Sequence, residues 1–172
     1  MKVKWFGQAA FLFVSETGLR IIADPYDPAI GYGDIADAAD VVTISHEHRD
    51  HNYIAGVGGK PQVLRGPGLQ EAKGIQFKGI STFHDKSQGG ERGSNTVFCF
   101  SLDGVRVCHL GDLGHLLSDE QIRDIGEVDL LLIPRRACHH QCGGGQRTYR
   151  QNEATGCRSH AFQDGKGWTT LC

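Results

Sequence analysis

The stretch Ile44-Ser45-His46-Glu47-His48-Arg49-Asp50-His51-Asn52 places three histidines and an aspartate within six residues. It follows Val41–Ile44, an apolar, β-branched run that predicts a buried strand. Side chains alternate between the faces of an extended chain, so we expect His46 and His48 to point the same way and to share one metal ion. The aspartate and histidine that follow, where the chain must turn, can serve a second ion. A solvated loop that happens to be rich in histidine is the alternative, which this spacing disfavours.

The H-x-H-x-D-H spacing after a strand resembles the signature of the metallo-β-lactamase fold superfamily. The resemblance implies an α+β fold, the four-layer αββα sandwich, with its C-terminal part incomplete or aberrant in this chain. It covers residues 1–134 almost continuously and is nearest to stand-alone Zn-dependent hydrolases that include the ascorbate-6-phosphate lactonase-like proteins. We expect a metallo-β-lactamase-like domain at residues 1–134 and an aberrant, poorly ordered tail at residues 135–172.

The resemblance also assigns metal ligands. His84, in Phe83-His84-Asp85 at the end of a predicted strand, stands where the superfamily places its third histidine ligand. Asp112, in the Gly111-Asp112 pair that follows another strand, stands where a carboxylate bridges two metals. His46, His48 and His84 would then hold the first ion. The second would be held by Asp50 and His51, and Asp112 would bridge the two ions.

Five further residues are candidates to support the site or to contact substrate. Asp24, before Pro25, resembles an acidic residue that supports the metal loop, although it can equally be a turn former. Gln8 stands where relatives often have histidine in a Gly-His-Ala loop, and its amide cannot act as an acid near neutral pH. The other candidates are Asp85 and Asn95, at the ends of a glycine-rich loop that is either a lid or a mobile hairpin end, and His115. His109 is expected to pack or support.

Apolar patterns predict the remaining elements. A capping box formed by Ser118 and Gln121 opens a short helix, and Asp103-Gly104 predicts a tight hairpin turn. The loop at Tyr26–Ala39 is expected near the mouth of the site. The predicted strands are Val3–Phe6, Ala10–Val14, Leu19–Ala23, Val63–Leu64, Ile75–Ile80, Thr96–Phe100, Val105–Leu110 and Val128–Ile133.

Composition sets limits on partners and location. The net charge of −2 gives no reason to expect nucleic acid or an anionic membrane as a partner. No apolar run approaches the ~20 residues of a membrane span, and the chain opens directly on strand-like sequence without a signal peptide. We expect a cytoplasmic protein with a small-molecule substrate, without disulfides in that reducing compartment. The sequence does not indicate an oligomeric state.

The sequence changes character at Pro134. The net charge is −6 up to that residue and +4 after it, and four of the six cysteines lie in the tail. One interpretation is a second zinc site with loosely finger-like spacing, formed by Cys138, Cys142, Cys157 and His160. The hypothesis that we favour is a frameshift near the codon of Pro134.

Codon degeneracy gives freedom in reading another frame, but several forced positions fit the frameshift. Reading the last two bases of each codon from Arg135 with the first base of the next permits V-G-x-A-T-I-S-A-A-E-A-S-E-L-I-G-R-M-K-P-R-V-V-V-P-M-H-F. That string contains an amphipathic helix, a β-branched strand and the Pro-Met-His-aromatic ending of relatives, whose histidine binds the second metal. The tail histidines would then be accidents of translation and the second site would be weakened. Sequencing the source DNA decides this question.

The chemistry implied by the resemblance is hydrolysis. A metal-bound hydroxide attacks an ester, lactone or phosphoester while metal polarises the electrophile, and Asp50 orients the hydroxide or shuttles its proton. We expect two zinc ions, with iron or manganese as possible substitutes. Three alternatives remain: a di-iron redox relative, a nucleic-acid processing relative, although no basic arm is evident, and a catalytically impaired fragment that only binds metal.

Overall fold

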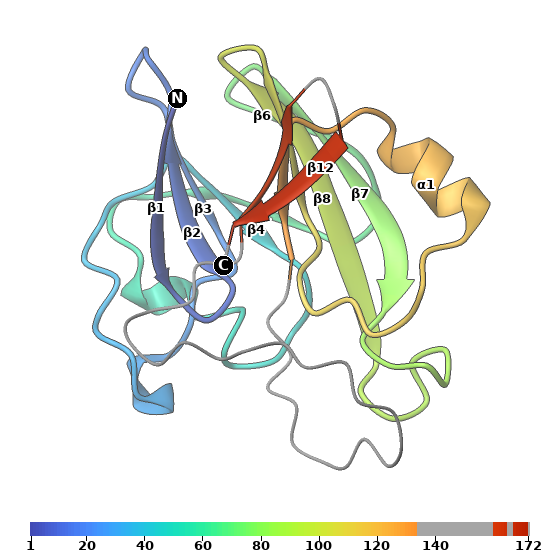
Figure 1. Ribbon diagram of the computed structural model, residues 1–172. Coiled ribbons are helices and arrows are strands. Elements are labelled where there is room, and N and C mark those ends of the chain that lie inside the picture. Colours follow the sequence, from blue (N-terminus) through green and yellow to red (C-terminus); the bar gives the residue numbers. More distant parts are fainter. Residues whose placement is uncertain (134–159, 165–166, 172) are drawn as a thin grey trace.

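The computed structural model describes residues 1–133 and the backbone of residues 160–164 and 167–171. Two β-sheets stand against each other as the layers of a sandwich (Figure 1). The first sheet has the strand order β1-β2-β3-β4-β5, and the second has the order β12-β11-β10-β9-β8-β7-β6. Each sheet is therefore built from one contiguous part of the chain.

The first sheet begins with an antiparallel meander and ends with two parallel strands. Pairing is antiparallel from β1 through β3 and parallel from β3 through β5. Parallel pairing brings the carboxyl ends of β3 and β4 to the same edge, so Asp24 and Ser45 become neighbours. The strands are β1 (Lys2–Gly7), β2 (Ala10–Val14), β3 (Arg20–Ala23), β4 (Val41–Ile44) and β5 (Gln62–Arg65).

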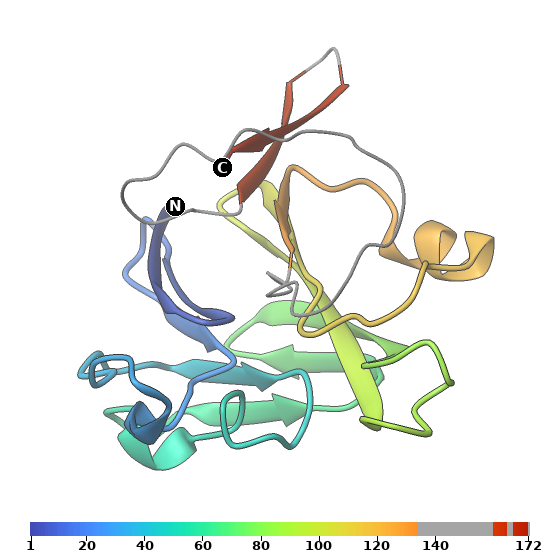
Figure 2. The same cartoon turned by 60° about the horizontal axis from the view of Figure 1, so that its bottom comes forward.

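The second sheet is antiparallel except where β9 and β10 run parallel. Its two longest strands, β7 and β8, pair antiparallel with each other (Figure 2). The strands are β6 (Gly68–Ala72), β7 (Ile75–Phe83), β8 (Ser94–Leu102), β9 (Val105–His109), β10 (Leu130–Leu132), β11 (His160–Asp164) and β12 (Gly167–Leu171).

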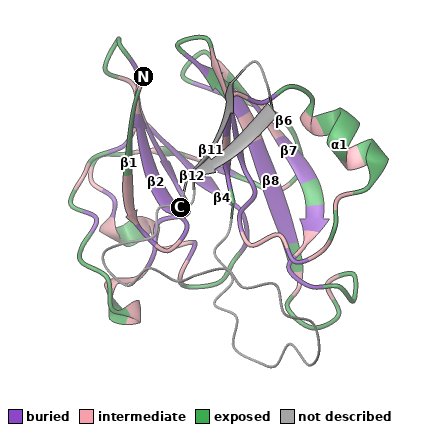
Figure 3. Ribbon diagram, in the orientation of Figure 1, coloured by how far each residue is buried: buried purple, intermediate pink, exposed green. Residues whose placement is uncertain are grey.

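The main core lies between the two sheets. Alternate residues of the strands point inward, so Phe11 and Phe13 of β2 meet Phe77 and Phe100 of the second sheet. Phe13 and Phe100 pack edge to face, with ring centroids 5.3 Å apart. Buried residues lie on strands of both sheets (Figure 3), and one cluster packs residues of the two sheets together.

Fewer α-helices cover the outer faces of the two sheets, within the described residues, than the αββα sandwich predicts. The sandwich is confirmed, but within the described residues its outer cover includes one α-helix, α1 (Asp119–Ile125), against the second sheet. Ser118 and Gln121 form the predicted capping box. The first sheet is covered by loops with the 3-10 turns η1 (Pro28–Ile30) and η2 (Ile54–Gly56). No helix in the described part of the chain is long and apolar enough to span a membrane.

The predicted strands agree with the structure except near the edges. Sequence reasoning missed β6, which lacks β-branched residues, and placed the start of β10 too early. It also extended the strand through His48, whereas β4 ends at Ile44 and the chain bends at residues 45–48. The expected cysteine site and frameshift fall largely outside the described residues, and the expected loss of order over residues 135–172 stays a prediction, since only the backbone of β11 and β12 is described there.

An ion pair anchors the parallel strands β9 and β10. Asp129 accepts hydrogen bonds from the backbone N–H of Arg106 at 2.9 Å and from the Arg106 guanidinium at 2.8 and 2.7 Å. The guanidinium also contacts Glu127. The hydrogen bond from the Arg106 side chain, and then that from its backbone N–H, lower the pKa of Asp129 to about 2.

Replacing Asp129 with Asn should lower the melting temperature near neutral pH. The ordinary pKa of the carboxyl is 3.8, so its ionised form stabilises the fold above about pH 4, and this contribution is lost as the pH falls toward about 2. Thermal melts across that range should show a weaker pH dependence for Asp129→Asn than for the wild type. Glu71→Gln, at an exposed position on β6, is the control. Parallel pH profiles for the wild type and Asp129→Asn would contradict the assignment.

Candidate metal centre

The predicted metal residues meet at one edge of the sandwich. The loops after β4, β7 and β9 and the turn between β1 and β2 all lie at this edge, toward the bottom of Figure 1. A backbone hydrogen bond joins the two sheets here, from the Thr96 N–H of β8 to the Ser45 carbonyl at 2.8 Å, and within the second sheet the Gly114 N–H donates to the Phe83 carbonyl at 2.9 Å. The centre is thus assembled from both sheets.

Three histidines form the first group. His46 Nε2 lies 3.0 Å from His48 Nδ1, and the ring of His84 lies 4.9 Å from that of His46. One nitrogen from each residue falls within 4.8 Å of the others. Zinc with bonds of about 2.0–2.1 Å puts two tetrahedral nitrogen ligands about 3.3 Å apart, so the spacing suits one ion. The two loop histidines converge although the chain between them is bent.

A buried carboxylate determines which nitrogens face the centre. Asp24, fully buried after β3, accepts hydrogen bonds from the N–H of Ser45 at 2.7 Å, from the Ser45 hydroxyl and from His51 Nδ1 at 2.9 Å. Because the Ser45 hydroxyl donates to Asp24, it must accept from His46 Nδ1, 2.9 Å away. Both His46 and His51 therefore keep a proton on Nδ1 and turn Nε2 toward the centre.

The second group shares His46 with the first. Ligand atoms of His46, His51 and Asp112 fall within 4.8 Å of one another. His51 Nε2 lies 3.4 Å from Asp112 Oδ2 and 3.6 Å from Asp50 Oδ2, and His84 Nε2 lies 3.2 Å from the same Asp112 oxygen. Asp112 therefore stands between the two groups, at the position expected of a bridging ligand.

Opposite charges shift the pKa values within the cluster. Burial alone would lower the pKa of His51, but contacts with Asp112 and Asp24 outweigh it and raise that pKa to about 10. Burial, and then the charge of His51, lower the pKa of His46 to about 4. Burial opposes ionisation of Asp112, yet the neighbouring histidines, His51 foremost, bring its pKa to about 2. The Asp112 carboxylate thus remains charged over the ordinary pH range and attracts a cation.

The loop that carries Asp112 is fixed by Asn95. The amide oxygen of Asn95 accepts from the backbone N–H of Asp112 at 3.0 Å, and its NH₂ donates to Thr82 and to the Leu110 carbonyl. Gly111 has a φ of 55°, and a Cβ there would lie 2.5 Å from both Asn95 Oδ1 and Ser45 Cβ. Only glycine allows this approach of the two sheets, a requirement that the sequence pattern alone did not reveal.

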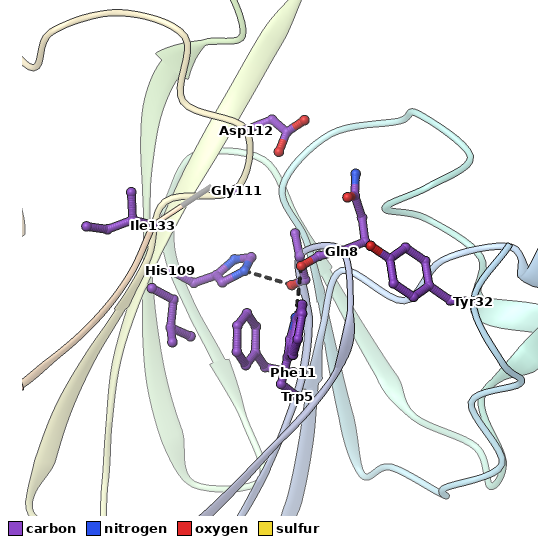
Figure 4. A pocket seen from close by; sticks show the side chains of 10 residues that line it. Trp5, Gln8, Phe11, Tyr32, His109, Gly111, Asp112 and Ile133 are labelled. Atoms are coloured by element: carbon purple, nitrogen blue, oxygen red, sulfur yellow. Dashed lines mark hydrogen bonds between the residues drawn. The ribbon is translucent and has the colours of Figure 1, made fainter. Parts of the chain in front are cut away.

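Asp50 is held from the opposite side by Gln8. The amide nitrogen of Gln8 donates to Asp50 Oδ2 at 2.8 Å. Gln8 has a left-handed φ of 48°, and its carbonyl accepts from Trp5 Nε1 at 3.0 Å. This turn borders a cavity of about 220 Å³ (Figure 4) whose lining includes Trp5, Gln8, Phe11, Tyr32, His109 and Asp112. The predicted placement of the Tyr26–Ala39 loop beside the site agrees with the position of Tyr32.

The remaining candidates lie around the centre. The Asp85 carboxylate accepts hydrogen bonds from four backbone N–H groups within residues 87–92, and these bonds hold the glycine-rich loop in shape. Burial would raise the pKa of Asp85, but the four bonds outweigh it and lower that pKa. His115 uses both ring nitrogens on the backbone, at Phe83 N–H and the Leu116 carbonyl. His109 donates Nε2–H to the Ala9 carbonyl at 3.0 Å, so it joins the two sheets below the cavity.

The donor set suits a metal ion. His51 Nε2 is buried without a hydrogen-bond partner in the described part of the chain, although buried polar atoms normally have one. Imidazole nitrogens and carboxylate oxygens are ligands of zinc, iron and manganese. His46, His48 and His84 could hold one ion, and His51 and Asp112, with Asp50 beside them, could hold another.

Comparison with known proteins identifies relatives of this arrangement. Residues 2–157 match a family model described as a beta-lactamase superfamily domain. A UPF0173 metal-dependent hydrolase of Methanoculleus marisnigri is 31% identical over 164 residues, covering 80% of this chain and 70% of the relative. Another UPF0173 metal-dependent hydrolase, from Methanospirillum hungatei, is 33% identical over 160 residues, which cover 78% of this chain and 69% of the relative.

Solved structures share the fold. A Thermotoga maritima protein, assigned to the Zn-dependent hydrolases of the metallo-beta-lactamase superfamily, superposes with a TM-score of 0.60 at 41% identity. The match covers 75% of this chain and 58% of that one, so the chain spans less than two thirds of that structure. CmlA, a diiron beta-hydroxylase from Streptomyces venezuelae, superposes with a TM-score of 0.52 at 18% identity. The match covers 74% of this chain and 33% of the CmlA chain.

Gly114→Ala should weaken metal binding although residue 114 offers no ligand. A Cβ at this position would lie 2.1 Å from the backbone carbon and oxygen of His84, so the loop or His84 must move. Changes to residues that orient metal ligands typically cost about 10- to 100-fold in affinity, and we expect a loss of this size in a competitive zinc titration.

Gly33→Ala is the matched control, because a Cβ there meets no atom within 4 Å. It should bind zinc like the wild type. Unchanged zinc affinity in a folded Gly114→Ala protein would show that the close approach to His84 does not position that ligand.

Proposed function

The chain belongs to the beta-lactamase superfamily, and from that membership we propose that it is a zinc-dependent hydrolase of a small-molecule ester, lactone or phosphoester. The observation that carries the proposal is the group formed by His46, His48 and His84, whose ligand atoms converge within 4.8 Å. Three histidines leave the fourth position of a tetrahedral zinc ion for water or substrate, which is the arrangement of catalytic rather than structural zinc.

A second ion would be held by Asp50, His51 and Asp112. The carboxylate of Asp112 lies between His51 and His84, at 3.4 and 3.2 Å, and its two oxygens can contact two cations. Three carboxylates, including that of Asp24, converge on this edge of the sandwich.

Zinc bound at this centre would supply Lewis acidity and a water molecule whose pKa lies near neutrality. The chain's own groups would orient the reaction. Asp24 holds His51 directly and His46 through Ser45, so the ligand geometry is set before substrate arrives. Gln8 occupies one oxygen of Asp50, and the side chain of Asp50, 31% exposed, leaves the other oxygen able to accept a proton.

The cavity beside Asp112 supports a substrate with an apolar portion. Trp5, Phe11 and Leu132 contribute apolar walls, whereas Gln8 and Asp112 place polar groups at the side nearest the metal residues (Figure 4). Its volume of about 220 Å³ is below the ~300–1,000 Å³ of drug-sized ligand pockets. A small molecule with its scissile bond at the polar side and its apolar portion inside would fit this distribution.

The relatives support hydrolysis and metal dependence. The Methanoculleus marisnigri and Methanospirillum hungatei proteins are described as metal-dependent hydrolases, and the Thermotoga maritima relative is assigned to the Zn-dependent ones. CmlA, with the same fold, is a diiron enzyme, so metal analysis of the purified protein is the test of zinc against iron. A panel of lactone, carboxylester and phosphodiester substrates would distinguish the three substrate classes.

Replacing His46 and His48 together with Ala should abolish stoichiometric zinc binding and hydrolysis, because His84 alone would remain of the first group. Zinc content by plasma mass spectrometry, with hydrolysis assayed on the same samples, tests this. Glu47→Gln is the matched control, since the carboxylate of Glu47 turns away toward Arg65 and Asn52. Full zinc content in the double variant would refute the assignment.

Asp112→Ala should reduce occupancy of the second ion more than that of the first. Three histidines remain for the first ion, whereas Asp112 is a large share of the ligands that the described residues offer to the second. Stepwise zinc titration with calorimetry separates the two binding events. Equal weakening of both events would argue against the bridging position.

A further inference from the structure

Two cysteines face each other on the second sheet, away from the metal centre. Cys99 of β8 and Cys108 of β9 are direct cross-strand partners, so their side chains project from the same face of the sheet. Cys108 is fully buried beside Ile80 and Val128, and Cys99 is half-buried at the margin of that apolar cluster.

The hairpin turn determines the kind of pair that they form. Asp103 and Gly104, with φ values of 51° and 77°, make the two-residue loop between Leu102 and Val105, as in a type I′ turn, which joins its flanking residues by a hydrogen bond. Hydrogen-bonded and non-hydrogen-bonded pairs alternate along an antiparallel ladder. Counting back along the register from Leu102, Cys99 and Cys108 form a non-hydrogen-bonded pair.

That position brings the two backbones within the span of a disulfide. Non-hydrogen-bonded partners have Cα atoms about 4.5 Å apart, and disulfides bridge Cα atoms about 4.4–6.8 Å apart. We propose that Cys99 and Cys108 are a reversible dithiol–disulfide pair that is oxidised by small disulfides such as oxidised glutathione.

The two thiols have unequal roles in this reaction. Cys99 borders a surface cavity of about 490 Å³ that Lys78 and Arg106 also line, so a small oxidant can reach it. The hydrogen bond from the Cys108 thiol lowers the pKa of Cys99 against the effect of burial, and the neighbouring Lys78 ammonium adds to this. The same thiol contact and burial raise the pKa of Cys108. Cys99 is therefore the entry thiol.

The exchange conserves atoms and electrons. The Cys99 thiolate attacks one sulfur of oxidised glutathione, forms a mixed disulfide and releases one glutathione thiolate. The Cys108 sulfur then attacks the Cys99 sulfur, and the proton of Cys108 passes to the second glutathione as it departs. The two protein thiols are oxidised to one disulfide, and one glutathione disulfide is reduced to two thiols.

The bond would tie together the two strands that support Asp112. Cys99 lies four residues after Asn95 on β8, and Cys108 lies four residues before Asp112 at the end of β9. Because Asn95 accepts the backbone N–H of Asp112, the disulfide would close the ladder beneath that hydrogen bond without touching a metal residue.

Peptide mapping of the full-length protein tests the proposal. After equilibration in glutathione buffers of graded ratio, alkylation and tryptic digestion, cleavage after Arg106 separates Cys99, on residues 93–106, from Cys108, on residues 107–123. We expect these two peptides to be joined at oxidising ratios and released by dithiothreitol. Both cysteines still alkylated as free thiols at the most oxidising ratio, or joined instead to cysteines of residues 135–172, would overturn the pair.

Single variants test the order of attack. Cys108→Ser should retain glutathione on Cys99, because the resolving thiol is missing. Cys99→Ser should leave Cys108 free at ratios that oxidise the wild type, because the buried thiol has lost its entry partner. Glutathionylation of Cys108 in the Cys99→Ser variant, at the ratio that oxidises the wild type, would contradict the assignment of Cys99 as the entry thiol. The wild-type map remains decisive for the pair if either variant fails to fold.

Discussion

The metal centre depends on the burial of one carboxylate. Moving a charged carboxylate out of water is costly unless it is paired and hydrogen-bonded, and Asp24 is fully buried. Ser45 and His51 together give it three hydrogen bonds. These same bonds leave Nε2 of His51, and through Ser45 that of His46, free to bind metal. The groups that stabilise the buried charge are thus the groups that the charge orients.

The second sheet brings its ligands to this frame by close backbone contact. Gly111 lies against Ser45 and Asn95, and Gly114 lies against the backbone of His84, in both cases where a Cβ would collide. The Asp112 carboxylate therefore arrives between His51 and His84 because glycine at 111 lets the loop approach Ser45 of the first sheet, and glycine at 114 lets it pack on the His84 backbone of its own sheet. A metal ion at this centre would join ligands from both sheets, so its binding energy would also stabilise the packing between them.

Sequence reasoning anticipated several residues of the site, one stretch from its own spacing and the others from the family resemblance. The H-x-H-x-D-H stretch, the acidic residue before Pro25 and the Gly111-Asp112 pair all come to one edge of the sandwich. Local patterns do not encode contacts between distant segments, so the link from Asp24 through Ser45 to His46 was not foreseen. His115 was a candidate for substrate contact because it lies beyond the Gly111-Asp112 pair, and its two ring nitrogens are bonded to backbone groups. The strand β6 was missed because its pairing with β7, rather than its composition, makes it a strand.

The pairing of Cys99 with Cys108 can be predicted from the strand register alone. The Asp103-Gly104 turn was visible in the sequence, and a two-residue hairpin fixes the register of its strands. From that register Cys99 and Cys108 follow as partners without further information. The burial of Cys108 could not be predicted in this way, because it depends on Ile80 of β7 and on Val128, which precedes β10.

Gln8 gives the centre a property that a histidine at the same position would not. Its amide donates to Asp50 and does not titrate near neutral pH, whereas a histidine would change charge with an ordinary pKa near 6.5. The bond to Asp50 therefore persists across the pH range in which histidine side chains ionise. Its geometry depends instead on the left-handed turn at Gln8, which Trp5 holds through the Gln8 carbonyl (Figure 4). In this chain the hydrogen bond that residue 8 donates to Asp50 therefore depends on backbone conformation and not on the protonation state of residue 8.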